Sequence, residues 1–349
     1  MRFKETQVIV LANQKGGCAK TTSSISIAAA FNKLGYSVAL VDTDPQCNAT
    51  TSFGIDPHGL FDQGKLSLLD AYLDKRAAID IKLEFESGRF EQPFVLIPGN
   101  SELGEVGSHL ELQAALLVSK FKRAEISLDD AKDEHRNRLR ESLKSLRGVY
   151  DVVIIDTPPN LGFLMTTALV AADWFIIPAF PSKYDLAGLE ELTITINKIK
   201  EKYNPTLKLA GVLLGNFDKN AKLDTQIYQK LCEKFGDNAV FQTTISRGVR
   251  MRELTFSNKT IFEFEPDSPQ AEQFLSLVRE MINRASKGTN TLKPLPELEK
   301  VIERSEASEV NLEKFEPDFE QTRATQNKAF TQEQVSELSS LEFKEVGNG

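Results

Sequence analysis

The residues from Asn13 to Thr22 read Asn-Gln-Lys-Gly-Gly-Cys-Ala-Lys-Thr-Thr and join an apolar run to a stretch with helical periodicity. In a glycine-rich turn between a strand and a helix, backbone N–H groups point inward and the helix dipole favours an anion. Lys20 is placed to neutralise the β- and γ-phosphates of a nucleotide, and the Thr21 hydroxyl is placed to bind Mg²⁺. The segment therefore predicts a phosphate-binding loop.

The spacing of this loop departs from the standard pattern G-x-x-x-x-G-K-[ST], because Gln14 and Ala19 stand at its two glycine positions. It fits instead a variant, K-G-G-x-x-K-T-[ST], in which a second lysine, Lys15, precedes the glycines. The residues that we expect to contact the nucleotide phosphates are Gly16, Gly17, Cys18, Ala19, Lys20, Thr21 and Thr22.

Acidic residues end two further apolar runs. Asp42 closes the run 38–42 and is followed by Asp44, and Asp156 closes the run 152–156. Carboxylates at neighbouring strand ends can hold Mg²⁺ through its waters and orient an attacking water. The pattern therefore predicts a metal site, although Asp44 could also serve as an N-cap or an Asx turn before the proline that follows it.

The elements that must position these residues alternate along residues 7 to about 285. Short runs rich in Val, Ile, Leu and Phe without polar alternation are typical of strands that are buried on both faces of a parallel sheet. The runs are 8–13, 38–42, 94–99, 152–156, 174–178, 209–215 and 239–243. Helical periodicity between them supplies the crossovers, most clearly at 21–35, 135–148, 186–203 and 270–286. We predict a doubly wound α/β fold of the P-loop NTPase type, with a mostly parallel sheet and helices on both faces.

Composition sets the outer bounds. The 349 residues carry 42 Lys and Arg against 50 Asp and Glu, a net charge of −8, so any DNA binding requires a local basic patch. Residues 287–349 hold 8 basic and 13 acidic residues and three prolines, which predicts an acidic, largely disordered tail after a domain at 1–286. Three scattered cysteines, no evident secretory signal and no transmembrane run favour a soluble cytoplasmic protein.

Three segments, QKGGCAKTT, VDTDPQCNAT and VVIIDTPPNLG, together resemble the ParA family of partition ATPases, within the deviant Walker A group that includes MinD. The resemblance extends over residues 7–285. It implies an ATP-sandwich homodimer in which Lys15 reaches the phosphates of the other subunit. It also implies that Asp44 positions or activates the hydrolytic water and that Asp42 and Asp156 support Mg²⁺. ATP hydrolysis is expected to be slow and stimulated by a partner.

The resemblance also implies nonspecific DNA binding, a ParB-like adaptor bound to the cargo, and association with the nucleoid. Two basic clusters are candidates for contacts with DNA phosphates: Arg247, Arg250 and Arg252, and Lys219 with Lys222. The alternative for both clusters is a solvated charged face. Asn216, at the end of a strand, could hydrogen-bond adenine or only close a turn.

The chain departs from the usual family form at five positions. Cys18, Ala19 and Cys47 exchange one small residue for another, which we expect the loops to accommodate. Ser246 and Asn220 alter the expected adenine wall and one expected DNA contact. We interpret both loop cysteines as small apolar fillers, the alternative being redox control of the site.

The same fold also serves other functions. ParA-like proteins position protein cargo as well as DNA, and nothing in the sequence separates the two. A MinD-like membrane cycle needs a basic amphipathic C-terminal helix, whereas the last 19 residues carry four Glu and one Lys, so no membrane partner is expected. An iron–sulfur reductase would need cluster cysteines at the dimer seam, and a ligase would need a small-molecule pocket that the sequence does not indicate.

Overall fold

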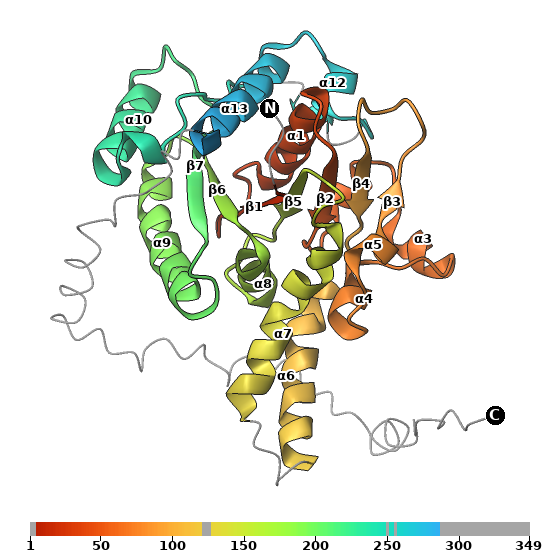
Figure 1. The fold of residues 1–349 in the computed structure, drawn as a ribbon. Helices are drawn as coiled ribbons and strands as arrows, with labels where there is room; N and C mark the ends of the chain where they lie inside the picture. Colours follow the sequence, from red (N-terminus) through yellow and green to blue (C-terminus); the bar gives the residue numbers. More distant parts are fainter. Residues whose placement is uncertain (1–4, 121–126, 249–250, 255–256, 287–349) are drawn as a thin grey trace, which may run out of the picture. The chain divides into compact units, whose positions relative to one another are not determined.

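The computed structural model describes residues 5–120, 127–248, 251–254 and 257–286, and within them lies a seven-stranded sheet (Figure 1). The strand order is β3-β4-β2-β5-β1-β6-β7, and every neighbouring pair is parallel except β3–β4. The strands are β1 (Gln7–Leu11), β2 (Val38–Asp42), β3 (Leu83–Glu84), β4 (Phe94–Ile97), β5 (Val152–Asp156), β6 (Trp174–Ala179) and β7 (Lys208–Leu214).

Both faces of the sheet are covered, which confirms the expected fold class. Alternate residues of one strand enter different cores: Val8 and Val10 pack on one face, Ile9 and Leu11 on the other. Helices α1 (Lys20–Lys33) and α13 (Pro269–Ser286) cover the second face, and α7 (Leu128–Leu143), α8 (Phe163–Ala171) and α9 (Lys183–Tyr203) cover the first (Figure 1). All five residues of β2 and of β5 are buried, as an apolar run without alternation predicts.

The remaining helices are shorter or lie at the ends of the sheet. They are α2 (Asn48–Thr51), α3 (Pro57–Asp62), α4 (Leu68–Leu73), α5 (Ala78–Ile81), α6 (Leu103–Lys120), α10 (Lys222–Phe235), α11 (Met251–Leu254) and α12 (Ile261–Phe264), with 3₁₀ turns at Lys144–Leu146 and Asp237–Ala239. None of the helices in the described part of the chain has the length and apolar character that a membrane span requires.

Two predicted elements differ from the structure. The run 239–243 is not a strand and joins β7 through a single bridge, Val212–Val240. Side chains of α13 take the hydrogen bonds that a further strand would have made, because Arg284 donates to the carbonyl of Val240 and Glu280 accepts from the N–H of Thr243.

The second difference is the start of α7, which lies seven residues before the predicted 135–148. Ser127 and Asp130 form a capping box there: the Asp130 N–H donates to Ser127 Oγ at 3.1 Å, and Ser127 Oγ donates to Asp130 Oδ2 at 2.7 Å. This cap begins the helix before its first basic residues. The predicted acidic tail, 287–349, lies outside the described residues.

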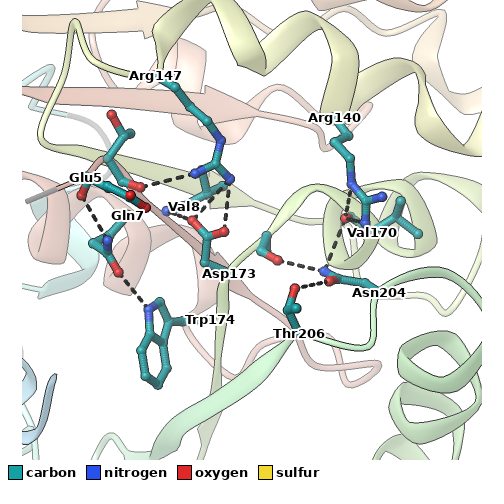
Figure 2. A network of polar contacts seen from close by, with 12 residues as sticks. Glu5, Gln7, Val8, Arg140, Arg147, Val170, Asp173, Trp174, Asn204 and Thr206 are labelled. Atoms are coloured by element: carbon teal, nitrogen blue, oxygen red, sulfur yellow. Dashed lines mark hydrogen bonds and ion pairs between the residues drawn. The ribbon is translucent and has the colours of Figure 1, made fainter. Parts of the chain in front are cut away.

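The amino edge of the sheet is closed by polar contacts, which Figure 2 shows. Arg147 pairs with Asp173 at 2.9 Å, and Asp173 Oδ2 in turn accepts the N–H of Val8 at 2.8 Å, where β1 begins. Nearby, the Arg140 guanidinium and the Asn204 amide both donate to the carbonyl of Val170 at the end of α8. These contacts lie at the amino edge of the sheet, whereas Asp42 and Asp156 end their strands at the opposite, carboxyl edge.

Candidate functional site

The loop between β1 and α1 has the form of an anion cradle. Asn13 anchors it, because its side chain donates to the carbonyl of Pro178 at 2.7 Å and accepts the N–H of Lys15 at 2.9 Å. The buried Lys20 ammonium donates to the carbonyl of Lys15 at 3.0 Å, which curls the loop over the start of α1. Ala19 is the N-cap of α1, and its side chain makes no capping hydrogen bond. The N–H groups of the first turn of α1 are therefore not occupied by the N-cap side chain and can bind an anion.

Two residues of the site adopt the left-handed backbone conformation that favours glycine. Ala19 has φ 63° and ψ 33° and precedes α1, and Cys47 has φ 53° and ψ 32° and precedes α2. Both helices therefore begin with the same sharp turn at the same edge of the sheet. The turn aims the first residues of α1 and α2 into one cleft, at the expense of backbone strain at an alanine and a cysteine.

Asp42 and Asp156 lie directly opposite each other in the β2–β5 register and are completely buried. Asp42 Oδ2 accepts hydrogen bonds from the N–H and hydroxyl of Thr50 at 2.8 and 2.7 Å. Asp156 Oδ1 accepts from the Ser24 hydroxyl at 2.8 Å, whereas its buried Oδ2 has no hydrogen-bond partner among the described residues.

Burial raises the pKa of both acids. Burial raises the pKa of Asp42 to about 6. Burial, followed by the negative charge of Asp42, raises the pKa of Asp156 to about 7, although the nearby hydroxyls of Thr21 and Ser24 oppose the shift. Two buried acids of like charge are stabilised by a proton or by a cation, and oxygen donors are the ligands that Mg²⁺ prefers. The Asp156 carboxylate, which lies near the Thr21 hydroxyl and has one oxygen without a hydrogen-bond partner among the described residues, therefore fits the predicted magnesium site.

Asp44 lies beyond this pair, at the wall of the cleft. Its Oδ1 accepts the N–H of Gln46 at 2.9 Å, so the Asx turn that the sequence left open is present. The side chain nevertheless lines the cleft together with Gly16 and Lys20. The turn holds one carboxylate oxygen in place, which positions the carboxylate at the cleft wall.

The cleft has a volume of about 690 Å³, in the range of small-molecule sites. Besides phosphate-loop residues it is lined by residues that the sequence did not single out, from α2, from the loop after β5 and from the turn before α12: Gln46, Asn48, Thr51, Ser52, Pro159 and Asn258. A one-turn helix such as α2 leaves no periodicity to detect, so its contribution gave no sequence signal.

Several predicted residues are not among those that line this cleft. Asn216 is exposed with φ 53°, does not line the cleft, and its carbonyl accepts from Arg247 Nε at 3.2 Å, so it closes a turn. Lys15, Lys219 and Lys222 are exposed. Arg250 and the side chain of Arg252 lie outside the described residues.

The loop cysteines are buried and, with Cys232, unpaired by disulfides. Burial, then the charges of Asp42 and Asp44, raises the pKa of the Cys47 thiol to about 12. A thiol that stays protonated is a poor nucleophile. The environment of Cys47 therefore agrees with its interpretation as a small filler.

Comparisons with known proteins find similar sequences. Residues 6–209 match a protein family described as an AAA domain. The chain is 34% identical over 278 residues to the chromosome partitioning protein ParA of Myxococcus xanthus, which covers 80% of this chain and 88% of that one. It is 32% identical over 275 residues to the sporulation initiation inhibitor protein Soj of Bacillus subtilis, covering 79% and 98% of the two chains.

Solved structures show the same fold. Cobyrinic acid a,c-diamide synthase from Mycobacterium smegmatis, crystallised with an ATP analogue and magnesium, superposes with a TM-score of 0.63 at 27% identity over 82% of this chain and 98% of that chain. The septum site-determining protein MinD from Pyrococcus horikoshii, complexed with Mg-ADP, gives 0.57 at 20% identity over 80% and 97%. At that identity the second likeness concerns the fold alone.

Proposed function

The chain belongs to the ParA family of partition ATPases, within the P-loop group that contains MinD, and we propose that it hydrolyses Mg-ATP to position DNA cargo. The observation that supports this most strongly is the placement of the buried Asp42–Asp156 pair beside the phosphate loop, with one Asp156 oxygen free. We assign this activity to residues 1–286.

The phosphates of ATP would lie on the N–H groups of the loop and of the first turn of α1. Lys20 would offset their charge, and Thr21, Asp42 and Asp156 would hold Mg²⁺, directly or through its waters. The metal, when bound, neutralises charge on the β- and γ-phosphates. Asp44, held by its turn, would accept a hydrogen bond from the attacking water and orient it toward the γ-phosphate.

The exposed Lys15 makes the site dependent on a second copy. In an ATP-sandwich homodimer the lysine of one protomer would contact the phosphates bound to the other. A single protomer then carries an incomplete site. Intrinsic turnover is consequently slow, and a ParB-like adaptor on the cargo would raise it by completing or closing the site.

DNA binding would use local positive charge, since the chain as a whole is acidic. Arg247, Lys219 and Lys222 are exposed near the end of β7, where Phe217 bridges to Ser246. We propose that ATP-driven dimerisation joins two such surfaces, together with Arg250 and Arg252, into one that holds DNA phosphates without sequence preference. The protein would thus act in the cytoplasm, on the nucleoid.

A mobility shift on nonspecific duplex DNA tests this function, with no nucleotide, with ADP and with ATP. Binding should require ATP, persist in Asp44→Ala, which traps the ATP dimer, and fall at least about tenfold in Lys219→Glu/Lys222→Glu. A control for charge reversal elsewhere is Lys144→Glu, an exposed lysine of the 3₁₀ turn after α7. ATP-dependent dimers that bind no DNA would reject the DNA mechanism and favour protein cargo or a membrane surface.

A further inference from the structure

We propose that Thr50 is a positioning residue for Asp44 and that it acts through the buried carboxylate of Asp42. The inference rests on the proposed function, in which Asp44 orients the attacking water. Thr50 is completely buried and is not among the residues that line the cleft. An effect of its side chain on the reaction must therefore pass through the residues that it contacts.

The segment 44–50 is attached at both ends to a single carboxylate. Asp42 Oδ1 accepts the N–H of Asp44 at 3.2 Å, and Asp42 Oδ2 accepts the N–H and the hydroxyl of Thr50 at 2.8 and 2.7 Å. Between these ends, Gln46 and Asn48 line the cleft together with Asp44. The place of the Asp44 side chain at the cleft wall therefore depends on how Asp42 holds the two ends of the segment.

The Thr50 hydroxyl joins this segment to a neighbouring strand. It donates to Asp42 Oδ2 and also accepts the N–H of Gly99 at 2.9 Å. Gly99 follows β4, the strand that pairs with β2, and its backbone is buried. A buried hydroxyl that both donates and accepts makes both of its partners more rigid. The hydroxyl thus links the segment 44–50, the Asp42 carboxylate and the end of β4.

The Asp42 carboxylate is confined from both sides. A Cβ on Gly99 would lie 3.1 Å from Asp42 Cγ and 3.2 Å from Asp42 Oδ2, tighter than side chains normally pack. On the other side, Asp156 of β5 lies opposite Asp42 in the strand register. Because β4 and β5 flank β2, the carboxylate has a fixed place in the sheet, and the segment bonded to it has a fixed place as well.

Loss of the Thr50 hydroxyl would leave the buried N–H of Gly99 without this acceptor and Asp42 Oδ2 with one bond fewer. An unsatisfied buried group is costly, so we expect the segment 44–50 to shift and Asp44 to move with it. A displacement of about 1 Å at a reacting group can slow a reaction about 100-fold. ATP affinity should change little, because the phosphate loop is a separate segment that follows β1.

Three substitutions separate this role from a general loss of stability. Thr50→Val keeps the branched shape of the side chain and removes the hydroxyl, whereas Thr50→Ser keeps the hydroxyl. Thr6→Val is the matched control at the amino edge of the sheet. The buried Thr6 hydroxyl also joins an oxygen to a glycine, because it donates to the carbonyl of Tyr150 at 2.7 Å and accepts the N–H of Gly148 at 2.8 Å.

The experiment measures phosphate release from Mg-ATP in a single turnover, the Kd for ATP by calorimetric titration, and thermal unfolding. Thr50→Val should release phosphate about ten- to 100-fold more slowly than the wild type at unchanged ATP affinity, and Thr50→Ser should restore most of the rate. Thr6→Val should melt at a lower temperature, as Thr50→Val does, yet keep the wild-type rate where it is folded.

A double-variant cycle tests whether Thr50 acts through Asp44. In Asp44→Ala the residue that Thr50 positions is absent, so adding Thr50→Val should slow phosphate release no further. If Thr50→Val does not fold, Gly99→Ala takes its place in every measurement. The added methyl group would displace the Asp42 carboxylate, so the same slow release at unchanged ATP affinity is expected.

Wild-type release by the folded variant of this junction would overturn the proposal. So would a further loss of rate in the Asp44→Ala background, which would place the effect on the metal or the phosphates, or an equal loss of rate in Thr6→Val. Failure of the proposed function looks different, because the wild-type protein would then release no phosphate from Mg-ATP.

Discussion

Asp42 and Asp156 are acids that the fold buries before any cation is bound. Their pKa values, about 6 and about 7, lie above the ordinary value of 3.8. Between pH 3.8 and the raised pKa values, these two carboxyl groups bind more protons in the folded protein than in the unfolded chain. Their contribution to the free energy of unfolding is therefore full below pH 3.8 and is lost as the pH rises through 6 and 7. In the absence of metal, the free energy of unfolding is therefore lower at neutral pH than at acidic pH.

The first prediction is a pH-dependent effect of Asp156→Asn in metal-free protein. At pH 7.5 the variant should unfold with a higher free energy than the wild type, and the gap should shrink by about 1–3 kcal/mol at pH 5.5. Urea titrations in a chelating buffer measure it. A gap that stays constant between the two pH values would mean that Asp156 is already ionised in the folded protein.

A second prediction concerns the left-handed turns before α1 and α2. Ala19→Gly and Cys47→Gly should each raise the free energy of unfolding by up to about 1 kcal/mol, because glycine relieves about 1–2 kcal/mol of strain but orders a freer backbone. Ala115→Gly, at an exposed position inside α6, should instead lower it by about 1 kcal/mol. If urea denaturation shows that the loop variants lose stability as Ala115→Gly does, the two turns are not strained.

At the scale of single residues, the sequence predicts those site residues that lie close to the end of a strand. Lys20, Asp42, Asp44 and Asp156 come within a few residues of an apolar run, and parallel strands bring those ends together. Asn258 does not lie near the end of a strand. It reaches the cleft from a turn far along the chain, supported by Arg89 from another segment, and no local pattern carries that information.

At the scale of the elements, helix α6 packs against both the loop that carries Asp44 and the segment that follows Asp156. A Cβ on Gly104 would lie 3.7 Å from Pro45, which follows Asp44, and one on Gly107 would lie 2.9 Å from Phe163, where α8 begins after the Asp156 loop. The glycines let one helix pack closely on both segments. The positions of Asp44 and of the Asp156 loop therefore depend on the packing of α6.

The third prediction is that Gly107→Val displaces Phe163. The variant should lose about 1–3 kcal/mol of stability and show slower ATP hydrolysis at temperatures where it is folded. Gly104→Ala, whose methyl group would make an ordinary contact, should behave like the wild type. A Gly107→Val protein with wild-type stability in urea and wild-type turnover would show that the packing tolerates the added side chain.

Element boundaries show where sequence patterns fail. The run 239–243 has the composition of a buried strand, yet Arg284 and Glu280 of α13 satisfy its backbone, which only the assembled fold reveals. The start of α7 was missed because Ser127 and Asp130 form a cap in a polar stretch without apolar periodicity. Long apolar strands and amphipathic helices, in contrast, were predicted correctly.

At the scale of the whole molecule, an acidic chain with net charge −8 has to bind DNA through local charge. The fourth prediction is therefore steep salt dependence. If Lys219 and Lys222 each contact a phosphate in both protomers, Lys219→Ala/Lys222→Ala should reduce the slope of log K against log salt by about 3–4. A slope identical to that of the wild type would place the DNA on another surface.

We propose above that the carboxyl edge of the sheet hydrolyses ATP, with Asp44 orienting the water. Release of inorganic phosphate from Mg-ATP tests it most directly, measured beside ATP binding for the wild type, Lys20→Ala and Asp44→Ala. We predict slow release by the wild type, weak ATP binding by Lys20→Ala, and release about 100-fold slower by Asp44→Ala at unchanged ATP affinity. Wild-type release by Asp44→Ala would contradict the account.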